Sequence, residues 1–94
     1  MKYTHNESII MMRQAFTEQL TITYRLFESM PSEQESFSAL VTLDSASGAK
    51  EDYFIPDIAR ERSVAISLFE RLWQRSVLPC EVESIYSDGF SEIL

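Results

Sequence analysis

The side chains in this sequence that could act as nucleophiles or bases are few and far apart. Cys80 follows Pro79 at the expected start of a helix, where free backbone N–H groups favour a thiolate. A nucleophilic cysteine also needs a base, yet the one histidine, His5, lies near the other end of the chain. The nearest charges, Glu81 and Glu83, oppose thiolate formation. We therefore expect Cys80 to be an inert, partly buried thiol.

The other polar groupings do not form a recognisable catalytic motif. The segment SIYSDGF, residues 84–90, has serines near an aspartate, but a nucleophile elbow needs a glycine on both sides of the serine. The carboxylate pairs Glu33 with Glu35 and Glu81 with Glu83 are typical of a polar loop and a helix surface. One histidine and one cysteine are too few ligands for a zinc site, and no glycine-rich phosphate loop or calcium loop is present in the sequence. We predict a protein that is not an enzyme and uses no cofactor or metal.

Length and composition indicate one globular domain spanning residues 1–94. A hydrophobic fraction of 45% is far from the composition of disordered chains. The formal net charge of −7 repels phosphate backbones and anionic lipids, so we expect neither direct nucleic-acid binding nor membrane attachment. No apolar run reaches the ~20 residues of a membrane span, and a single cysteine forms no internal disulfide. These features favour a cytoplasmic protein, whose translation start at Met1 or at Met11–Met12 the sequence leaves open.

Alternating apolar residues predict strands in the first half of the chain. In QLTITYRLFE, residues 19–28, every second side chain is apolar, and FSALVTLD, residues 37–44, repeats the pattern. Between them, MPSEQES, residues 30–36, reads as a polar turn, and Gly48 supplies the next reversal. These two strands should pair as an antiparallel hairpin.

The second half of the chain changes from strand to helix periodicity. EDYFIP, residues 51–56, predicts a third, shorter strand that Pro56 ends. Asp57 is the expected N-cap of the first helix, and Pro79 is the expected opening residue of a second. An apolar stripe of period 3.6 marks the buried side of the first helix and comprises Ile58, Ala65, Leu68, Phe69, Leu72 and Trp73.

Residues 1–15 leave two alternatives open. They form an amphipathic helix capped by Asn6, with Ile9, Met12 and Phe16 in one line, or they fray as short terminal segments often do. The whole pattern predicts an α+β fold. A three-stranded antiparallel β-meander is followed by two C-terminal helices packed on one sheet face.

Three arginines of the expected first helix form a candidate partner-binding group. Arg60, Arg71 and Arg75 should share one ridge of a helical wheel, where they could receive an acidic partner. The alternative is that acidic side chains of the same chain neutralise them, since such exposed pairs contribute only about 0–1 kcal/mol each. The sequence favours this alternative.

Three apolar residues of the expected strands form a second candidate group. Phe27, Leu40 and Phe54 should point to the sheet face opposite the helices, and a meander also has two unpaired edges. We therefore predict self-association as a homodimer, by pairing of edge strands or by packing of sheet faces. The alternative is that the N-terminal segment or the C-terminal helix covers this face within one chain.

The order of several short motifs resembles a family of short bacterial proteins catalogued as a domain of unknown function. The motifs are YRL at 24–26, PDI at 56–58, VLP at 77–79 and an acidic, apolar C-terminus, and the resemblance covers residues 20–94. The family tends to have a serine after Asp-Ile, where this chain has Ala59. The resemblance implies a small regulatory or accessory role and supplies no catalytic residues.

Together these features predict a small non-enzymatic interaction or regulatory protein that binds a protein partner, either a second copy of itself or another protein. A different class is the alternative: an acidic mimic that occupies the basic groove of a nucleic-acid-binding protein. Such a mimic needs carboxylates spread over one continuous surface.

Overall fold

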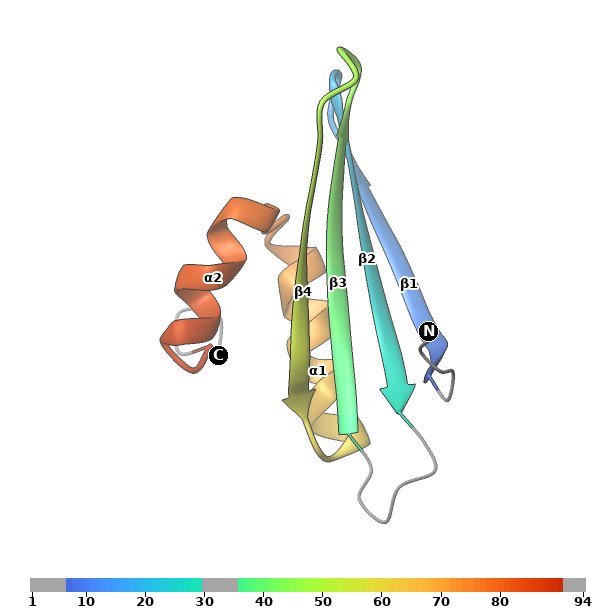
Figure 1. Ribbon diagram of the computed structural model, residues 1–94, viewed down its shortest axis with the longest axis vertical. Helices are drawn as coiled ribbons and strands as arrows, with labels where there is room; N and C mark the ends of the chain where they lie inside the picture. The colour runs from blue at the N-terminus through green and yellow to red at the C-terminus, as the bar shows by residue number, and fades with distance from the viewer. Residues whose placement is uncertain (1–6, 30–35, 91–94) are drawn as a thin grey trace, which may run out of the picture.

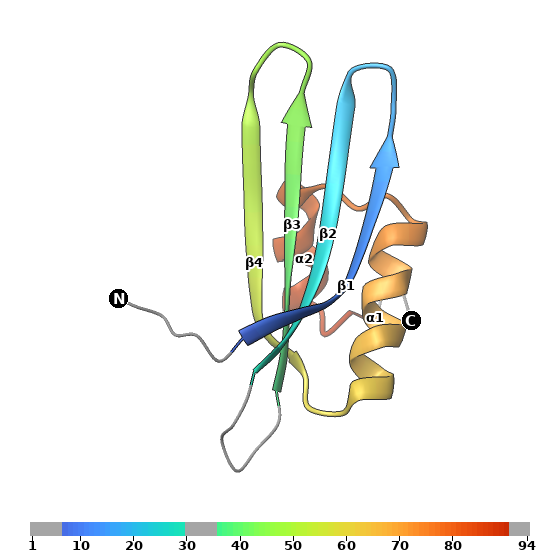
Figure 2. The ribbon, with the colours of Figure 1, turned by 90° about the vertical axis from the view of Figure 1, so that its right-hand side faces the viewer.

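A computed structural model describes residues 7–29 and 36–90 of the chain. It has two layers, a sheet of long strands and two helices that lie on one of its faces (Figures 1 and 2). The elements are β1 (Glu7–Phe16), β2 (Leu20–Ser29), β3 (Ser36–Ser45), β4 (Lys50–Ala59), α1 (Arg62–Gln74) and α2 (Pro79–Ser87).

The sheet is an antiparallel meander with strand order β1-β2-β3-β4. The α+β class and the two helices on one face are confirmed, but the predicted count of three strands is wrong, because the N-terminal segment is the strand β1 and not a helix. The helical reading came from Ile9, Met12 and Phe16, which are spaced as on one side of a helix. A β-bulge between Ile9 and Met11 places the same three residues on one face of the strand.

β4 continues past the proline that was expected to end it. Pro56 lies within β4, and the pairing with β3 shifts register in this region, where Asp57 has a positive φ of 62°. An edge strand tolerates proline because one side of its backbone needs no partner. The predicted N-cap Asp57 is therefore wrong. α1 begins five residues later, and its N-cap Glu61 makes no capping hydrogen bond through its side chain.

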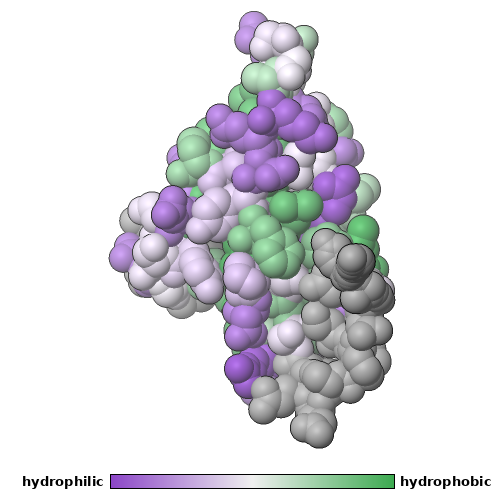
Figure 3. Space-filling view, in the orientation of Figure 1, coloured by the Kyte–Doolittle hydropathy of each residue, from purple (hydrophilic) through white to green (hydrophobic). Residues whose placement is uncertain are grey.

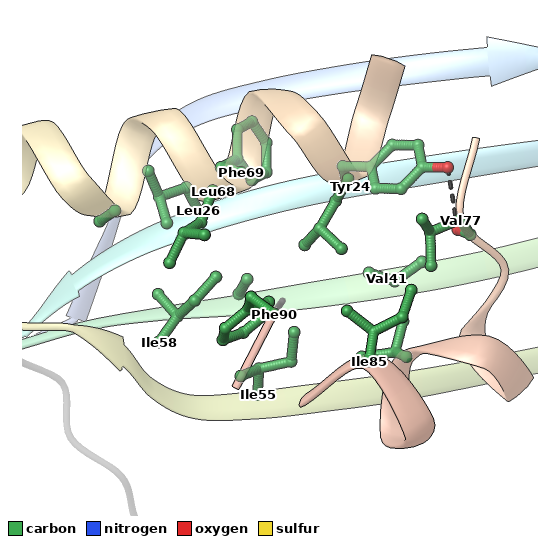
Figure 4. Packing of buried hydrophobic residues seen from close by; sticks show 14 of the residues in the cluster. Tyr24, Leu26, Val41, Ile55, Ile58, Leu68, Phe69, Val77, Ile85 and Phe90 are labelled. Carbon is green, nitrogen blue, oxygen red and sulfur yellow. Dashed lines mark hydrogen bonds between the residues drawn. The ribbon is translucent and has the colours of Figure 1, made fainter. Parts of the chain in front are cut away.

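The core lies between the helices and one face of the sheet (Figure 4). α1 contributes Ala65, Leu68, Phe69 and Leu72, as its stripe predicted. α2 begins at Pro79, as expected, and buries Val82 and Ile85. The strand residues of the core are Ile22, Tyr24, Leu26, Phe37, Ala39, Val41, Ile55 and Ile58.

Tyr24 joins the sheet to the connection between the two helices. Its hydroxyl is buried and donates a hydrogen bond to the carbonyl oxygen of Val77 at 2.9 Å (Figure 4). Burial raises the pKa of the Tyr24 hydroxyl above its usual value, and the negative charge of Glu81 raises it further. The neutral phenol is thus the form that the fold accommodates.

Candidate interaction surface

The structure describes only some of the groups considered for catalysis. Cys80 is exposed on the first turn of α2, contrary to the partly buried position expected for it. Ser84 lies on the same helix and is exposed, whereas His5, Glu33 and Glu35 lie outside the described residues. Within residues 7–29 and 36–90, no group of three or more His, Cys, Asp or Glu side chains could hold a metal ion.

The three candidate arginines do not share one helix. Arg60 precedes α1 and pairs with Asp57 at 3.8 Å, at the end where the helix begins. Arg71 and Arg75 lie at the other end of α1, so the expected ridge of three is not formed.

Two other arginines tie α1 to the sheet, which the sequence did not indicate. Arg13 of β1 pairs with Glu70 at 3.1 Å, and its guanidinium lies 5.6 Å from the centre of the Trp73 ring. Arg62 at the start of α1 pairs with the buried Glu28 at 2.8 Å. Each partner belongs to a different element, so only the folded topology brings the pairs together.

These pairs also bear on the alternative of an acidic mimic. Glu28, Asp57 and Glu70 each pair with an arginine of the same chain, at three different places. Glu81 accepts a hydrogen bond from the backbone N–H of Leu78 at the start of α2. Carboxylates engaged in this way give little support to one continuous acidic surface.

The sheet face that carries no helix brings together the second candidate group. We call it the open face. Leu40 and Phe54 are direct cross-strand partners, and Phe27 lies on the neighbouring strand opposite Ser38. The alternating register gives the open face the following residues: Ile9, Met12, Gln14 and Phe16 of β1, Thr21, Thr23, Arg25 and Phe27 of β2, Ser36, Ser38, Leu40, Thr42 and Asp44 of β3, and Lys50, Asp52 and Phe54 of β4.

Its apolar side chains are more numerous than the sequence predicted, because β1 contributes to the face. Ile9, Met12 and Phe16 are exposed there, Phe16 to 67%. Figure 3 shows a hydrophobic area in the middle of the visible side of the molecule, between hydrophilic residues. The β-bulge gives Ile9, Met12 and Phe16 the spacing of a helix, so the sequence did not predict that they lie on the open face. No simple sequence signal distinguishes a bulged strand of this kind from a helix.

Small polar residues fill the spaces between these apolar side chains. Gln14 donates a hydrogen bond to the hydroxyl of Thr23 at 3.1 Å, which links β1 to β2 across the face. Thr23, Ser38 and Thr42 are buried by their larger neighbours. The Ser38 hydroxyl has no hydrogen-bond partner among the described residues, an arrangement that is uncommon in folded proteins.

The two edges of the sheet are less available than its open face. On β1, the carbonyl oxygens of Met12 and Gln14 accept hydrogen bonds at 3.0 Å from the side chains of Arg13 and Trp73. These carbonyls are two residues apart and therefore point the same way. On β4, Pro56 has no N–H to donate, and Lys50, Glu51 and Asp52 are charged. Charges, proline and occupied carbonyls are features that keep edges from pairing.

The alternative prediction for the open face was that the N-terminal segment or the C-terminal helix covers it within one chain. α2 packs against β4 and β3 on the opposite side of the sheet, and β1 pairs with β2 as an edge strand of the sheet. The described N-terminal and C-terminal segments thus leave the face uncovered. No helix within the described part of the chain is long and apolar enough to cross a membrane.

No protein family, no curated protein and no solved structure matches this chain significantly. The resemblance to a bacterial family of unknown function therefore stays a prediction.

Proposed function

We propose that the protein is a small, non-enzymatic interaction or regulatory protein that self-associates through the open face of its sheet. The observation that supports this most directly is the distribution of exposed hydrophobic side chains. Of the six large ones among the described residues, Ile9, Met12, Phe16 and Phe54 lie on the open face. Exposed apolar side chains that gather on one face in this way mark interaction sites more often than isolated ones do.

The dimensions of the open face suit a second copy of the chain. Each strand has ten residues. With a rise of about 3.3 Å per residue and a strand spacing of about 4.8 Å, the four strands cover roughly 600 Å² in projection. Side-chain relief adds to this area, and a stable interface buries about 800 Å² on each partner. Face-to-face packing of two sheets would form a four-layer dimer with the helices outside.

Charge also favours a copy of the chain as the partner. Among the residues named above for the open face, two are basic, Arg25 and Lys50, and two are acidic, Asp44 and Asp52, so these four charges balance. The chain as a whole has a net charge of −7. The acidic surplus thus lies elsewhere, and two open faces can approach each other without strong repulsion.

The test replaces one apolar residue of the open face and one of equal exposure elsewhere. Phe54 is 45% exposed on the open face, and Val64 is 44% exposed on α1. We expect the wild type to sediment as a dimer at micromolar concentration. Phe54→Asp should raise the dissociation constant at least tenfold, because it replaces an exposed apolar side chain of the interface with a charge.

Val64→Asp is the matched control and should sediment like the wild type. A wild type that remains monomeric at high micromolar concentration would overturn the proposal. Equal effects of Phe54→Asp and Val64→Asp would also contradict it, since the loss would then reflect general charge instead of the face.

A further inference from the structure

The charged residues of the open face define the orientation of the two copies, an inference that rests on the self-association proposed above. Asp44 and Lys50 are direct cross-strand partners on β3 and β4, so each has an opposite charge beside it. Arg25 lies between Met12 and Leu40, and Asp52 lies opposite Thr42. None of these four charged residues forms an ion pair within residues 7–29 and 36–90, but Arg25 and Asp52 are the two that lack an opposite charge directly across on a neighbouring strand.

Arg25 and Asp52 are too far apart to compensate each other in one copy. Arg25 is on β2 and Asp52 on β4, with β3 between them, a separation of about 10 Å across the strands. They are also displaced along the strands, because Arg25 is level with Leu40 and Asp52 is level with Thr42. The face thus has one positive and one negative side chain with no opposite charge directly across from it, although Lys50 lies two residues from Asp52 on the same face of β4.

We propose that Arg25 of one copy pairs with Asp52 of the second copy in the face-to-face dimer. In a two-fold interface, a contact between two different positions occurs twice, so Asp52 of the first copy meets Arg25 of the second. The same pair of residues then satisfies both copies. A two-fold axis in the plane of the interface, midway between the two positions, places each residue opposite the other residue of the second copy.

The pairing offsets the cost of burying Arg25 when two open faces pack together. Arg25 is half-buried among apolar neighbours already, and a second sheet laid on the face would remove it further from water. A charge buried in this way is costly unless it is paired. Apolar contacts alone would tolerate several relative orientations of two sheets, whereas two ion pairs of this kind favour a single one.

The test exchanges the charges one at a time and then mixes the variants. Arg25→Glu places a second carboxylate opposite Asp52, and Asp52→Arg places a second guanidinium opposite Arg25. Each variant alone should have a dimer dissociation constant roughly 100-fold above that of the wild type. In an equimolar mixture, both contacts of the mixed dimer join opposite charges. With a fluorescent label on the Asp52→Arg chain, we expect sedimentation velocity to show this chain in a dimer at concentrations where each variant alone is monomeric.

The control mixture combines unlabelled Lys50→Glu with the same labelled Asp52→Arg chain. Lys50→Glu changes the net charge as much as Arg25→Glu does and also lies on the open face. In this mixture the labelled chain should stay monomeric, because one contact of the mixed dimer would still join two guanidinium groups. If the labelled chain formed dimers to the same extent in both mixtures, general charge attraction would explain the dimers, and the proposed pairing would be overturned.

The outcomes also separate this inference from the proposed function. If the wild type is a dimer but the mixture of Arg25→Glu and Asp52→Arg stays monomeric, the pairing is overturned and the open-face dimer is not. A monomeric wild type would overturn both. Circular dichroism of each variant checks that the fold is intact, and both substitutions lie outside the buried core.

Discussion

The two faces of the sheet are formed by the same strands, yet they differ in what covers them. Tyr24, Leu26 and Val41 point to the helices and are fully buried, whereas their sequence neighbours Arg25 and Leu40 lie on the open face. Successive residues of a strand point to opposite faces. A substitution on the face that packs against the helices should therefore affect folding stability. A substitution at the adjacent position, on the open face, should affect self-association.

The largest expected difference between the faces comes from two leucines on neighbouring strands. Leu26→Ala should lower the free energy of unfolding by about 2–5 kcal/mol, because it leaves a cavity under α1. Leu40→Ala should lower it by about 1 kcal/mol or less, since Leu40 is only half-buried. Urea unfolding, monitored by circular dichroism, measures both values.

Leu40→Ala should instead weaken self-association, which Leu26→Ala should leave intact at temperatures where it is folded. Equal losses of stability from the two substitutions would break the comparison, because they would show that Leu40 is as well packed within one copy as Leu26.

Tyr24→Phe tests a hydrogen bond on the sheet face that packs against the helices, which we call the covered face. The substitution keeps the ring but leaves the Val77 carbonyl without its donor, so we expect a loss of about 1–2 kcal/mol. Stability that is unchanged by Tyr24→Phe would show that this hydrogen bond adds nothing to burial of the ring.

Tyr24 should also make the free energy of unfolding depend on pH. Its pKa is raised in the folded state, so the unfolded chain loses this proton first as the pH increases. The stabilisation is fully present below about pH 10, the usual pKa of tyrosine, and declines above it at up to about 1.4 kcal/mol per pH unit. The wild type should lose stability faster than Tyr24→Phe above pH 10, measured by urea unfolding at each pH.

The smallest effect concerns the ion pairs at the start of α1. Arg62→Met should cost about 1 kcal/mol, because it leaves Glu28 buried without its partner at 2.8 Å. Arg60→Met should cost less, since its pair with Asp57 is longer and both side chains are exposed. A larger loss from Arg60→Met in thermal unfolding would contradict the view that the covered face carries the stability.

Much of the fold was predictable from local patterns. The alternation in residues 20–29 and 36–45, the stripe of α1 and the proline at the start of α2 are all signals that neighbouring residues carry. Phe27, Leu40 and Phe54 could be assigned to one face for the same reason, since strand alternation determines the face of each residue.

The predictions were wrong where the structure depends on contacts between residues far apart in the sequence. The bulge in β1 gives Ile9, Met12 and Phe16 a helical spacing, and the edge position of β4 lets Pro56 remain within a strand. The pairs of Arg13 with Glu70 and of Trp73 with Gln14 depend on how α1 crosses β1. Spacing along the chain contains no information about such contacts.

The bulge in β1 also affects how this chain tolerates changes in length over evolution. Ile10 is the additional residue, paired with none on β2, and it packs against the core beside Met11. A gene that lost the codon for Ile10 would encode a strand in which Ile9 still faces Phe27 and Met12 still faces Arg25. The open face would keep its composition after that deletion, whereas loss of one residue within residues 12–16 would reverse the faces of those that precede it.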